Sequence, residues 1–127
     1  MDDYEGTRYK VIHCEGAKES FLDELAKHVP RNLHANYKAR MRGLRRRLAD
    51  GHRMSKENFP REGKLPDGTH FRALKRIPLR AYIWQSSKHA GTFFISHYIY
   101  KNHNKLKQSD IKRVCDNWTI YEENNHE

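Results

Sequence analysis

The chain is poor in cysteine and in long apolar runs. Its 127 residues include two cysteines, Cys14 and Cys115, which are too few for a disulfide framework or a structural zinc site. No apolar run approaches the roughly 20 residues that a membrane-spanning helix needs. Residues 1–5 are acidic and polar, which predicts that no signal peptide is present. We therefore expect one cytoplasmic domain over residues 1–127, with no membrane partner.

Acidic residues are scarce in residues 70–113, where ten lysines and arginines accompany a single acid, Asp110. The net charge of the chain is +9, and its acids gather near the ends, with seven in residues 1–25 and four in residues 116–127. Such a basic middle attracts phosphate over long distances, so nucleic acid is the first partner to consider. The hydrophobic content of 36% is low, but the apolar residues recur periodically, which argues against wholesale disorder.

The apolar pattern predicts an α+β fold in the order βααβββα, in which an antiparallel sheet packs against two N-terminal helices and a short C-terminal helix. Residues 9–13 alternate weakly and predict the first strand. A helix is expected to begin at Ser20, as a capping residue, and to end at Pro30. The second helix is predicted by an apolar stripe at helical spacing: Leu33, Tyr37, Met41, Leu44 and Leu48.

Glycine, proline and charged residues dominate residues 51–68 and predict a long loop, whose length suggests a functional or mobile segment. Strand-like runs at 69–75, 79–84 and 93–101 follow and are expected to form an antiparallel meander. The last helix is predicted to begin with Ser109 as its N-cap.

The three later strands carry the side chains that RNA cleavage without a metal requires. A base must take the 2′-OH proton, cations must stabilise the phosphorane, and an acid must protonate the departing 5′-oxygen. Histidine, tyrosine and lysine can transfer protons, and the arginine fork suits a phosphate. The candidate catalytic residues are Arg72, Lys75, Arg80, His97, Tyr98, Lys101 and His103.

Strand alternation places Ile95 and His97 on one side of the last strand and Ser96 and Tyr98 on the other. His97 then lies among apolar neighbours, where a packed, hydrogen-bonded histidine is a more common role than a catalyst.

Further cations are expected to contact the phosphate backbone of RNA without reading its sequence. They are Lys38, Arg42, Arg45, Arg46, Arg76 and Lys105. For the arginine run 45–47, an exposed and solvated helix face is the alternative. No HExxH or CxxC spacing occurs, so we expect neither a metal nor another cofactor.

Three segments resemble the RelE/ParE superfamily of bacterial toxins, and especially its phage-derived HigB-like branch. Residues 71–75 (FRALK) are similar to the branch's [I/F]-R-E-L-[R/K] strand, and residues 80–84 (RAYIW) to its Y-R-[V/I]-[L/F]-Y strand. Residues 95–111 are similar to L-L-H-[G/A]-F-x-K-K-x-x-K-x-P-x-x-E-I. The chain departs from these patterns at three positions, where the branch has glutamate, lysine and proline: Ala73, Asn102 and Lys107.

This resemblance implies a RelE-like fold and the toxin component of a type II toxin–antitoxin system. Such toxins are commonly endoribonucleases that cut mRNA on the translating ribosome, and the implied partners are mRNA, the ribosome and a helix-turn-helix antitoxin. The family's basic and histidine positions fall on Arg72, Lys75, Arg80, His97 and Lys101. Two other functions stay open: a non-catalytic inhibitor of gyrase or another macromolecular target on the same fold, and a basic RNA- or DNA-binding module.

Overall fold

The computed structural model describes residues 3–101 and 105–123 of the chain. Six strands are present in these residues: β1 (Tyr4–Glu5), β2 (Lys10–His13), β3 (Arg61–Lys64), β4 (His70–Arg76), β5 (Leu79–Gln85) and β6 (Thr92–Tyr100). The helical segments are α1 (Ala17–His28), η1 (Arg31–Leu33), α2 (His34–Ala49), α3 (Gln108–Trp118) and η2 (Thr119–Glu123). The mixed α+β class is as predicted.

The strands form one sheet in the order β1-β2-β6-β5-β4-β3. Strands β4, β5 and β6 are the antiparallel meander expected from the sequence. Strand β2, however, runs parallel to β6, so the expectation of a wholly antiparallel sheet is wrong. A parallel pair needs a long connection, and here both large helices and strands β3, β4 and β5 lie between the two strands.

Two edge strands were not predicted from the sequence. Strand β1 is only two residues long. Strand β3 lies inside the predicted loop 51–68 and pairs with β4, with Arg61 opposite Arg72 and Lys64 opposite His70. The register shifts between these two pairs, and none of the four β3 residues is apolar apart from a glycine. An edge strand with no apolar side chain shows no apolar alternation that a sequence pattern could reveal.

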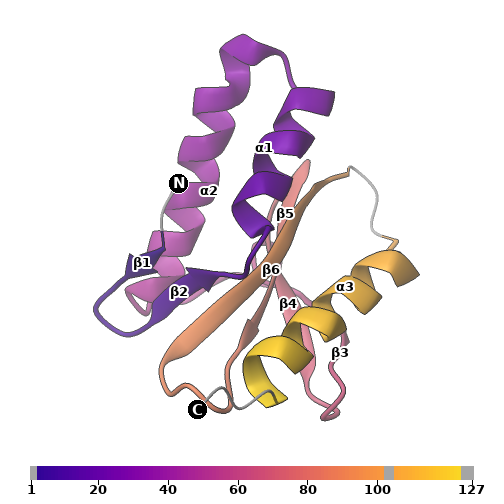
Figure 1. Ribbon diagram of the computed structural model, residues 1–127. Coiled ribbons are helices and arrows are strands. Elements are labelled where there is room, and N and C mark those ends of the chain that lie inside the picture. The colour runs from indigo at the N-terminus through magenta and orange to yellow at the C-terminus, as the bar shows by residue number, and fades with distance from the viewer. Residues whose placement is uncertain (1–2, 102–104, 124–127) are drawn as a thin grey trace.

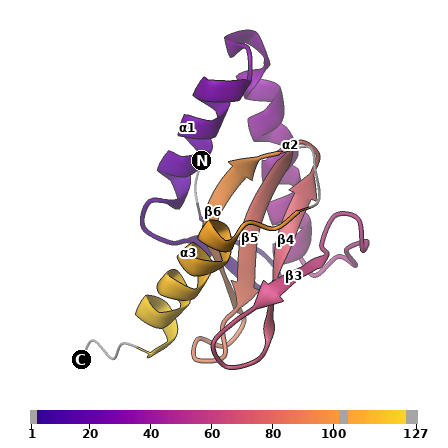
Figure 2. The same cartoon turned by 90° about the vertical axis from the view of Figure 1, so that its right-hand side faces the viewer.

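The helices cover opposite faces of the sheet (Figures 1 and 2), with α1 and α2 together on one face and α3 on the other. Each face has its own hydrophobic core. The α1–α2 side buries residues that include Phe21, Leu25, Met41, Leu44, Leu74, Ile83 and Ile95. The α3 side buries residues that include Phe71, Ala73, Tyr82, Trp84, Phe94, Val114 and Trp118. The central strands β5 and β6 are therefore buried on both faces, which explains why nearly all of their residues are buried.

The helix starts differ from the prediction at two serines. Helix α1 begins at Ala17, three residues before Ser20, which is buried within the helix. The Ser20 hydroxyl donates to the Ala17 carbonyl at 2.6 Å and accepts from the main-chain N–H of Tyr98 at 2.9 Å, so it joins α1 to β6 instead of capping the helix. Ser109 lies inside the first turn of α3 and is not its N-cap. In the part of the chain that the structure describes, no helix has the length and apolar character to cross a membrane.

Candidate functional site

A β-bulge in β6 decides which face of the sheet each of its side chains occupies. Tyr82 pairs with His97, whereas the next residue of β5, Ile83, pairs with Ile95, so Ser96 is the extra residue. Ile95 consequently packs in the core on the α1–α2 side, while His97 lies on the α3 side, 5.3 Å from Tyr82 between ring centroids. The predicted face assignment of β6 is wrong because it assumes an unbroken two-residue period.

Three of the predicted phosphate-binding cations converge on one carboxylate on the α3 side of the sheet. We call Glu62, Lys75, Arg80 and Lys101 the Glu62 cluster. Arg80 Nη1 lies 3.6 Å from Glu62 Oε1, and Lys75 is the cross-strand partner of Arg80. Lys101 directly follows β6, and its main-chain N–H donates to the carbonyl of Pro78 at 2.7 Å, next to the β4–β5 turn. The charges of Lys75, Arg80 and Lys101 all act on Glu62.

The pKa values of Glu62 and Lys101 are both shifted toward neutrality, that of Glu62 upward and that of Lys101 downward. Burial raises the pKa of Glu62 above its ordinary value of 4.5, although the three cations act in the opposite sense. Burial and the charge of Arg80 lower the pKa of Lys101 from 10.5, against the opposing effects of Asp110 and Glu62. A carboxyl group and an amine shifted in this way are suited to act as a general base and a general acid. Arg80, 1% exposed, adds a fixed positive charge beside them.

His97 lies on the same face of the sheet as the Glu62 cluster and is enclosed by hydrogen bonds. Its Nε2 is 2.9 Å from Asp110 Oδ1 and its Nδ1 is 2.7 Å from Ser96 Oγ, which also accepts from Asn117 Nδ2 at 2.8 Å. Burial lowers the pKa of His97, although Asp110 acts in the opposite sense. A neutral ring that donates from Nε2 to Asp110 and accepts at Nδ1 from the Ser96 hydroxyl satisfies the hydrogen bonds of both neighbours. Because His97 and Ser96 are both 0% exposed, this network joins β6 to α3 and is closed to a substrate.

Tyr98 lies on the opposite face of the sheet from the Glu62 cluster. Its hydroxyl accepts from Arg45 Nη1 at 3.1 Å and lies 2.7 Å from His13 Nε2, while His13 Nδ1 lies 2.9 Å from Asp3 Oδ1. Burial raises the pKa of Tyr98 to about 12. A buried phenol so far from titration at neutral pH serves the packing of α1 and α2 on the sheet, so it does not join the other candidate catalytic residues.

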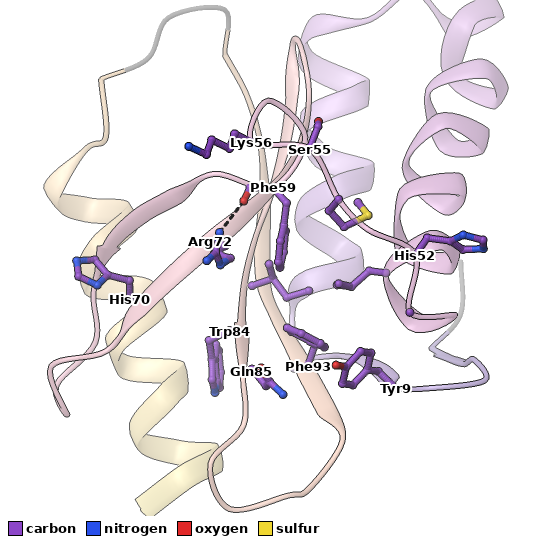
Figure 3. Close-up of a pocket in the computed structure, with 14 residues that line it drawn as sticks. Tyr9, His52, Ser55, Lys56, Phe59, His70, Arg72, Trp84, Gln85 and Phe93 are labelled. Atoms are coloured by element: carbon purple, nitrogen blue, oxygen red, sulfur yellow. Dashed lines mark hydrogen bonds between the residues drawn. The ribbon is translucent and has the colours of Figure 1, made fainter.

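Arg72 also lies on the α1–α2 side of the sheet, apart from the Glu62 cluster. Its Nη1 donates to the carbonyl of Phe59 at 2.9 Å, and its guanidinium lies 5.1 Å from the centroid of the Phe59 ring. Figure 3 shows this contact in a cavity of about 480 Å³, which we call the Arg72 pocket. Its aromatic lining is Tyr9, Phe59, Trp84 and Phe93, and its polar lining includes Lys56 and Gln85. His52 and His70 also line the pocket, but in Figure 3 they point away from its centre.

The predicted RNA-contacting cations do not form one surface. Lys38, Arg42 and Arg45 line a cleft between α1 and α2, together with Lys18 and Leu22. Arg45 is 3% exposed, so the alternative of an exposed and solvated helix face is wrong for this residue.

The three others lie elsewhere in the molecule. The guanidinium of Arg46 lies 5.3 Å from the centroid of the Tyr4 ring, and Arg76 borders a shallow cavity beside Lys75. Lys105 is exposed, and its carbonyl accepts a hydrogen bond from Lys101 Nζ.

Several members of these polar networks were not predicted as functional, and Glu62 and His13 are the most central of them. Glu62 lies in the segment interpreted as a loop, and its only local signal is an acid placed between two prolines and two basic residues. His13 belongs to the first predicted strand, where nothing in the sequence distinguishes it from an ordinary packed residue. His103, a predicted proton-transfer group, lies outside the described residues.

Among residues 3–101 and 105–123, no group of three or more His, Cys, Asp or Glu side chains could hold a metal ion. Comparison with protein-family models, with curated proteins and with solved structures gives no match for this chain.

Proposed function

We propose that this protein is a toxin that cleaves RNA without a metal, and that the Glu62 cluster is its catalytic centre. The observation that carries the proposal is the convergence of Lys75, Arg80 and Lys101 on a carboxylate whose pKa is raised by burial. Cations around a single proton acceptor are what cleavage through the 2′-OH requires, since negative charge develops on the phosphate as the base removes the proton.

Each group of the cluster has a defined part in the proposed reaction. The Glu62 carboxylate takes the proton of a ribose 2′-OH, whose oxygen attacks the adjacent phosphorus. The O2′–P bond forms and the P–O5′ bond breaks, which leaves a 2′,3′-cyclic phosphate. Arg80 and Lys75 stabilise the charge on the non-bridging oxygens. The ammonium of Lys101 gives its proton to the departing O5′.

The Arg72 pocket suits a nucleobase of the same RNA. Phe59 is half-buried, so its ring is partly accessible, and Arg72 adds a positive charge against it. Aromatic rings bind bases by stacking and tolerate sequence changes, because every base has a flat face. In this proposal Arg72 positions RNA and takes no part in the proton transfers.

The biological setting that we propose follows from the strand motifs. Their similarity to HigB-like toxins supports cleavage of mRNA on the translating ribosome and neutralisation by a helix-turn-helix antitoxin. The net charge of +9 supports a nucleic-acid substrate independently of the motifs.

One observation favours a second candidate, a non-catalytic inhibitor or RNA-binding module. Arg80 is 1% exposed and Lys101 is 5% exposed, so a substrate phosphate has to approach a largely enclosed cluster. In this alternative the cluster only holds β3 and the segment after β6 in place, and the Arg72 pocket is the binding surface.

The two candidates predict different rates of RNA cleavage when the Glu62 carboxylate is replaced by an amide. Purified wild type and Glu62→Gln are incubated with RNA in the presence of a metal chelator, and the products are identified by mass spectrometry. We expect wild type to leave 2′,3′-cyclic phosphate ends, and Glu62→Gln to cleave about 10²–10⁴-fold more slowly. Glu57→Gln is the matched control, since Glu57 is an exposed glutamate of the preceding loop.

The same proteins are then expressed in translating cells, and mRNA ends are mapped. Cut mRNA with wild type and Glu57→Gln, but not with Glu62→Gln, is the expected result. Growth arrest by wild type with intact RNA in both assays would refute the nuclease and favour the non-catalytic inhibitor.

A further inference from the structure

A separate basic site lies on the other layer of the molecule, between α1 and α2. Five described residues line a cavity of about 310 Å³, which we call the α1–α2 cleft: Lys18, Leu22, Lys38, Arg42 and Arg45. Four of the five are cations, contributed by both helices, and none is a carboxylate. Like charges repel when they are brought together, so a site of this composition is suited to a multivalent anion.

The strongest indication comes from Arg45, the most enclosed residue of the cleft at 3% exposed. In the described part of the chain its side chain hydrogen-bonds to the hydroxyl of Tyr98 and forms no ion pair with a carboxylate. A guanidinium has five N–H donors, and a neutral phenol satisfies few of them. Burying an unpaired charge is costly, and an anion in the cleft would provide the missing counter-charge.

The carboxylate that acts on this network, Asp3, is already hydrogen-bonded to His13. Asp3 acts electrostatically on Tyr98, but its Oδ1 accepts from the main-chain N–H of His13 at 2.8 Å and lies 2.9 Å from His13 Nδ1. Lys18 lowers the pKa values of both Asp3 and His13, so its positive charge is felt within the network. The local balance therefore remains positive around Arg45.

We propose that the α1–α2 cleft binds a terminal phosphoryl group. Such a group carries up to two negative charges and three acceptor oxygens, and it protrudes far enough to reach an enclosed arginine. An internal phosphate of RNA carries one charge and is flanked by riboses on both sides, so it reaches an enclosed arginine less readily than a terminal group does. The group occurs in pyrophosphate, in nucleoside diphosphates and at the 5′-phosphate end of RNA. The site lies apart from the Glu62 cluster and does not depend on RNA cleavage.

Titration calorimetry with the full chain at about 0.1 M salt tests the proposal. The ligands are pyrophosphate, ADP, and one RNA oligonucleotide with either a 5′-phosphate or a 5′-hydroxyl. We expect at least one ligand with a terminal phosphoryl group to bind with a dissociation constant below about 1 mM, and the tightest of them identifies the source. Arg42→Gln, an exposed substitution in the cleft, is expected to weaken that binding about tenfold.

Arg47→Gln is the matched control, because it removes the same charge from an exposed position of the same helix outside the cleft. Its binding is expected to stay within about twofold of wild type. Three results would overturn the site. The first is that wild type binds no ligand with a terminal phosphoryl group, and the second is that Arg42→Gln and Arg47→Gln lose binding equally. The third is equal affinity for the two RNA ends together with no binding of pyrophosphate or ADP. Circular dichroism on each variant ensures that a loss of binding is not a loss of folding.

Discussion

Arg80 Nη1 on β5 lies 3.6 Å from Glu62 Oε1 on β3, so the pair reaches across β4, the strand between them. The side chains are 1% and 11% exposed, respectively. Enclosed charges of this kind depend on each other, because removing one leaves the other desolvated and without its counter-charge. The contact thus ties the edge strand β3 to the centre of the sheet and holds a carboxylate among three cations.

A double-mutant cycle measures how far the contributions of Arg80 and Glu62 to stability depend on each other. Arg80→Met is expected to lower the free energy of unfolding by about 3 kcal/mol, because it leaves the Glu62 carboxylate in an enclosed site without the arginine charge. In the Glu62→Gln background the same substitution should cost at least about 1 kcal/mol less. Urea denaturation of the four proteins gives the values. Additive effects would show that the two side chains do not interact, and that β3 is held by its backbone pairing alone.

The role proposed for Lys101 is tested by Lys101→Arg. Arginine keeps the positive charge but does not release a proton at accessible pH. We expect RNA cleavage to fall by about 10²-fold or more and the alkaline limb of the pH–rate profile to disappear, while RNA binding stays close to wild type. Lys105→Arg, an exposed substitution four residues on, should leave the profile unchanged. A Lys101→Arg enzyme with normal activity would remove Lys101 as the general acid.

Elements with a regular apolar period were predicted correctly from the sequence. The stripe from Tyr37 to Leu48 lies in α2, and its first member, Leu33, ends η1 just before that helix. Its members recur at helical spacing, and Met41, Leu44 and Leu48 belong to the core on that side of the sheet. The three strands of the meander were found for a similar reason. The central strands β5 and β6 are buried on both faces and therefore carry apolar runs, at 81–84 and 93–95. These signals are local, and local signals can be recognised without knowing what lies opposite.

Features that depend on distant partners could not be predicted in this way. Strand β3 has no apolar period, and Glu62 acquires its surroundings only when β3 lies two strands away from Arg80. The bulge at Ser96 interrupts β6 without a glycine or proline to mark it, and it moved His97 to the face opposite the predicted one. Arg45 belongs to a run of three arginines, and only the packing of α2 on the sheet distinguishes it from its exposed neighbours.

The stability of the protein should fall as the pH drops below neutrality. Burial lowers the pKa values of His13 and His97 below 6.5, their value in the unfolded chain. Between the native and unfolded values the unfolded state binds more protons, so the free energy of unfolding decreases as the pH falls through about 6.5. Glu62 contributes in the opposite sense. Because its native pKa is raised, the folded state binds more protons than the unfolded state, so its contribution to the free energy of unfolding falls as the pH rises.

His97→Gln isolates the histidine contribution. The variant should lose less stability than wild type between about pH 7 and pH 5, by up to roughly 1.4 kcal/mol for each unit by which the native pKa of His97 is depressed. Denaturant unfolding at several pH values provides the measurement. His70→Gln, an exposed change on β4, should follow the wild-type curve. If His97→Gln follows it as well, the imidazole is not held neutral by its surroundings.

Gly63 and Gly43 provide a matched test of how closely β3 packs against the residues beneath it. A Cβ at Gly63 would lie 2.7 Å from Cε2 and 2.8 Å from Cζ of Phe71, which is fully buried, and 3.1 Å from Leu106. Gly63→Ala should therefore destabilise the protein by about 2 kcal/mol, because the edge strand has to move outward. Gly43 is exposed inside α2 and a Cβ there meets nothing within 4 Å, so Gly43→Ala should stabilise by roughly 0.5–1 kcal/mol.

The same two variants test whether RNA cleavage depends on the position of β3. Outward movement of β3 carries Glu62 away from Arg80, so Gly63→Ala should also slow RNA cleavage under conditions in which the protein is fully folded. Gly43→Ala should cleave at the wild-type rate, since α2 lies on the other face of the sheet. Thermal unfolding and the cleavage assay on the same preparations separate the two effects. A destabilised Gly63→Ala protein with undiminished cleavage would mean that the position of β3, and with it Glu62, is not needed for the reaction.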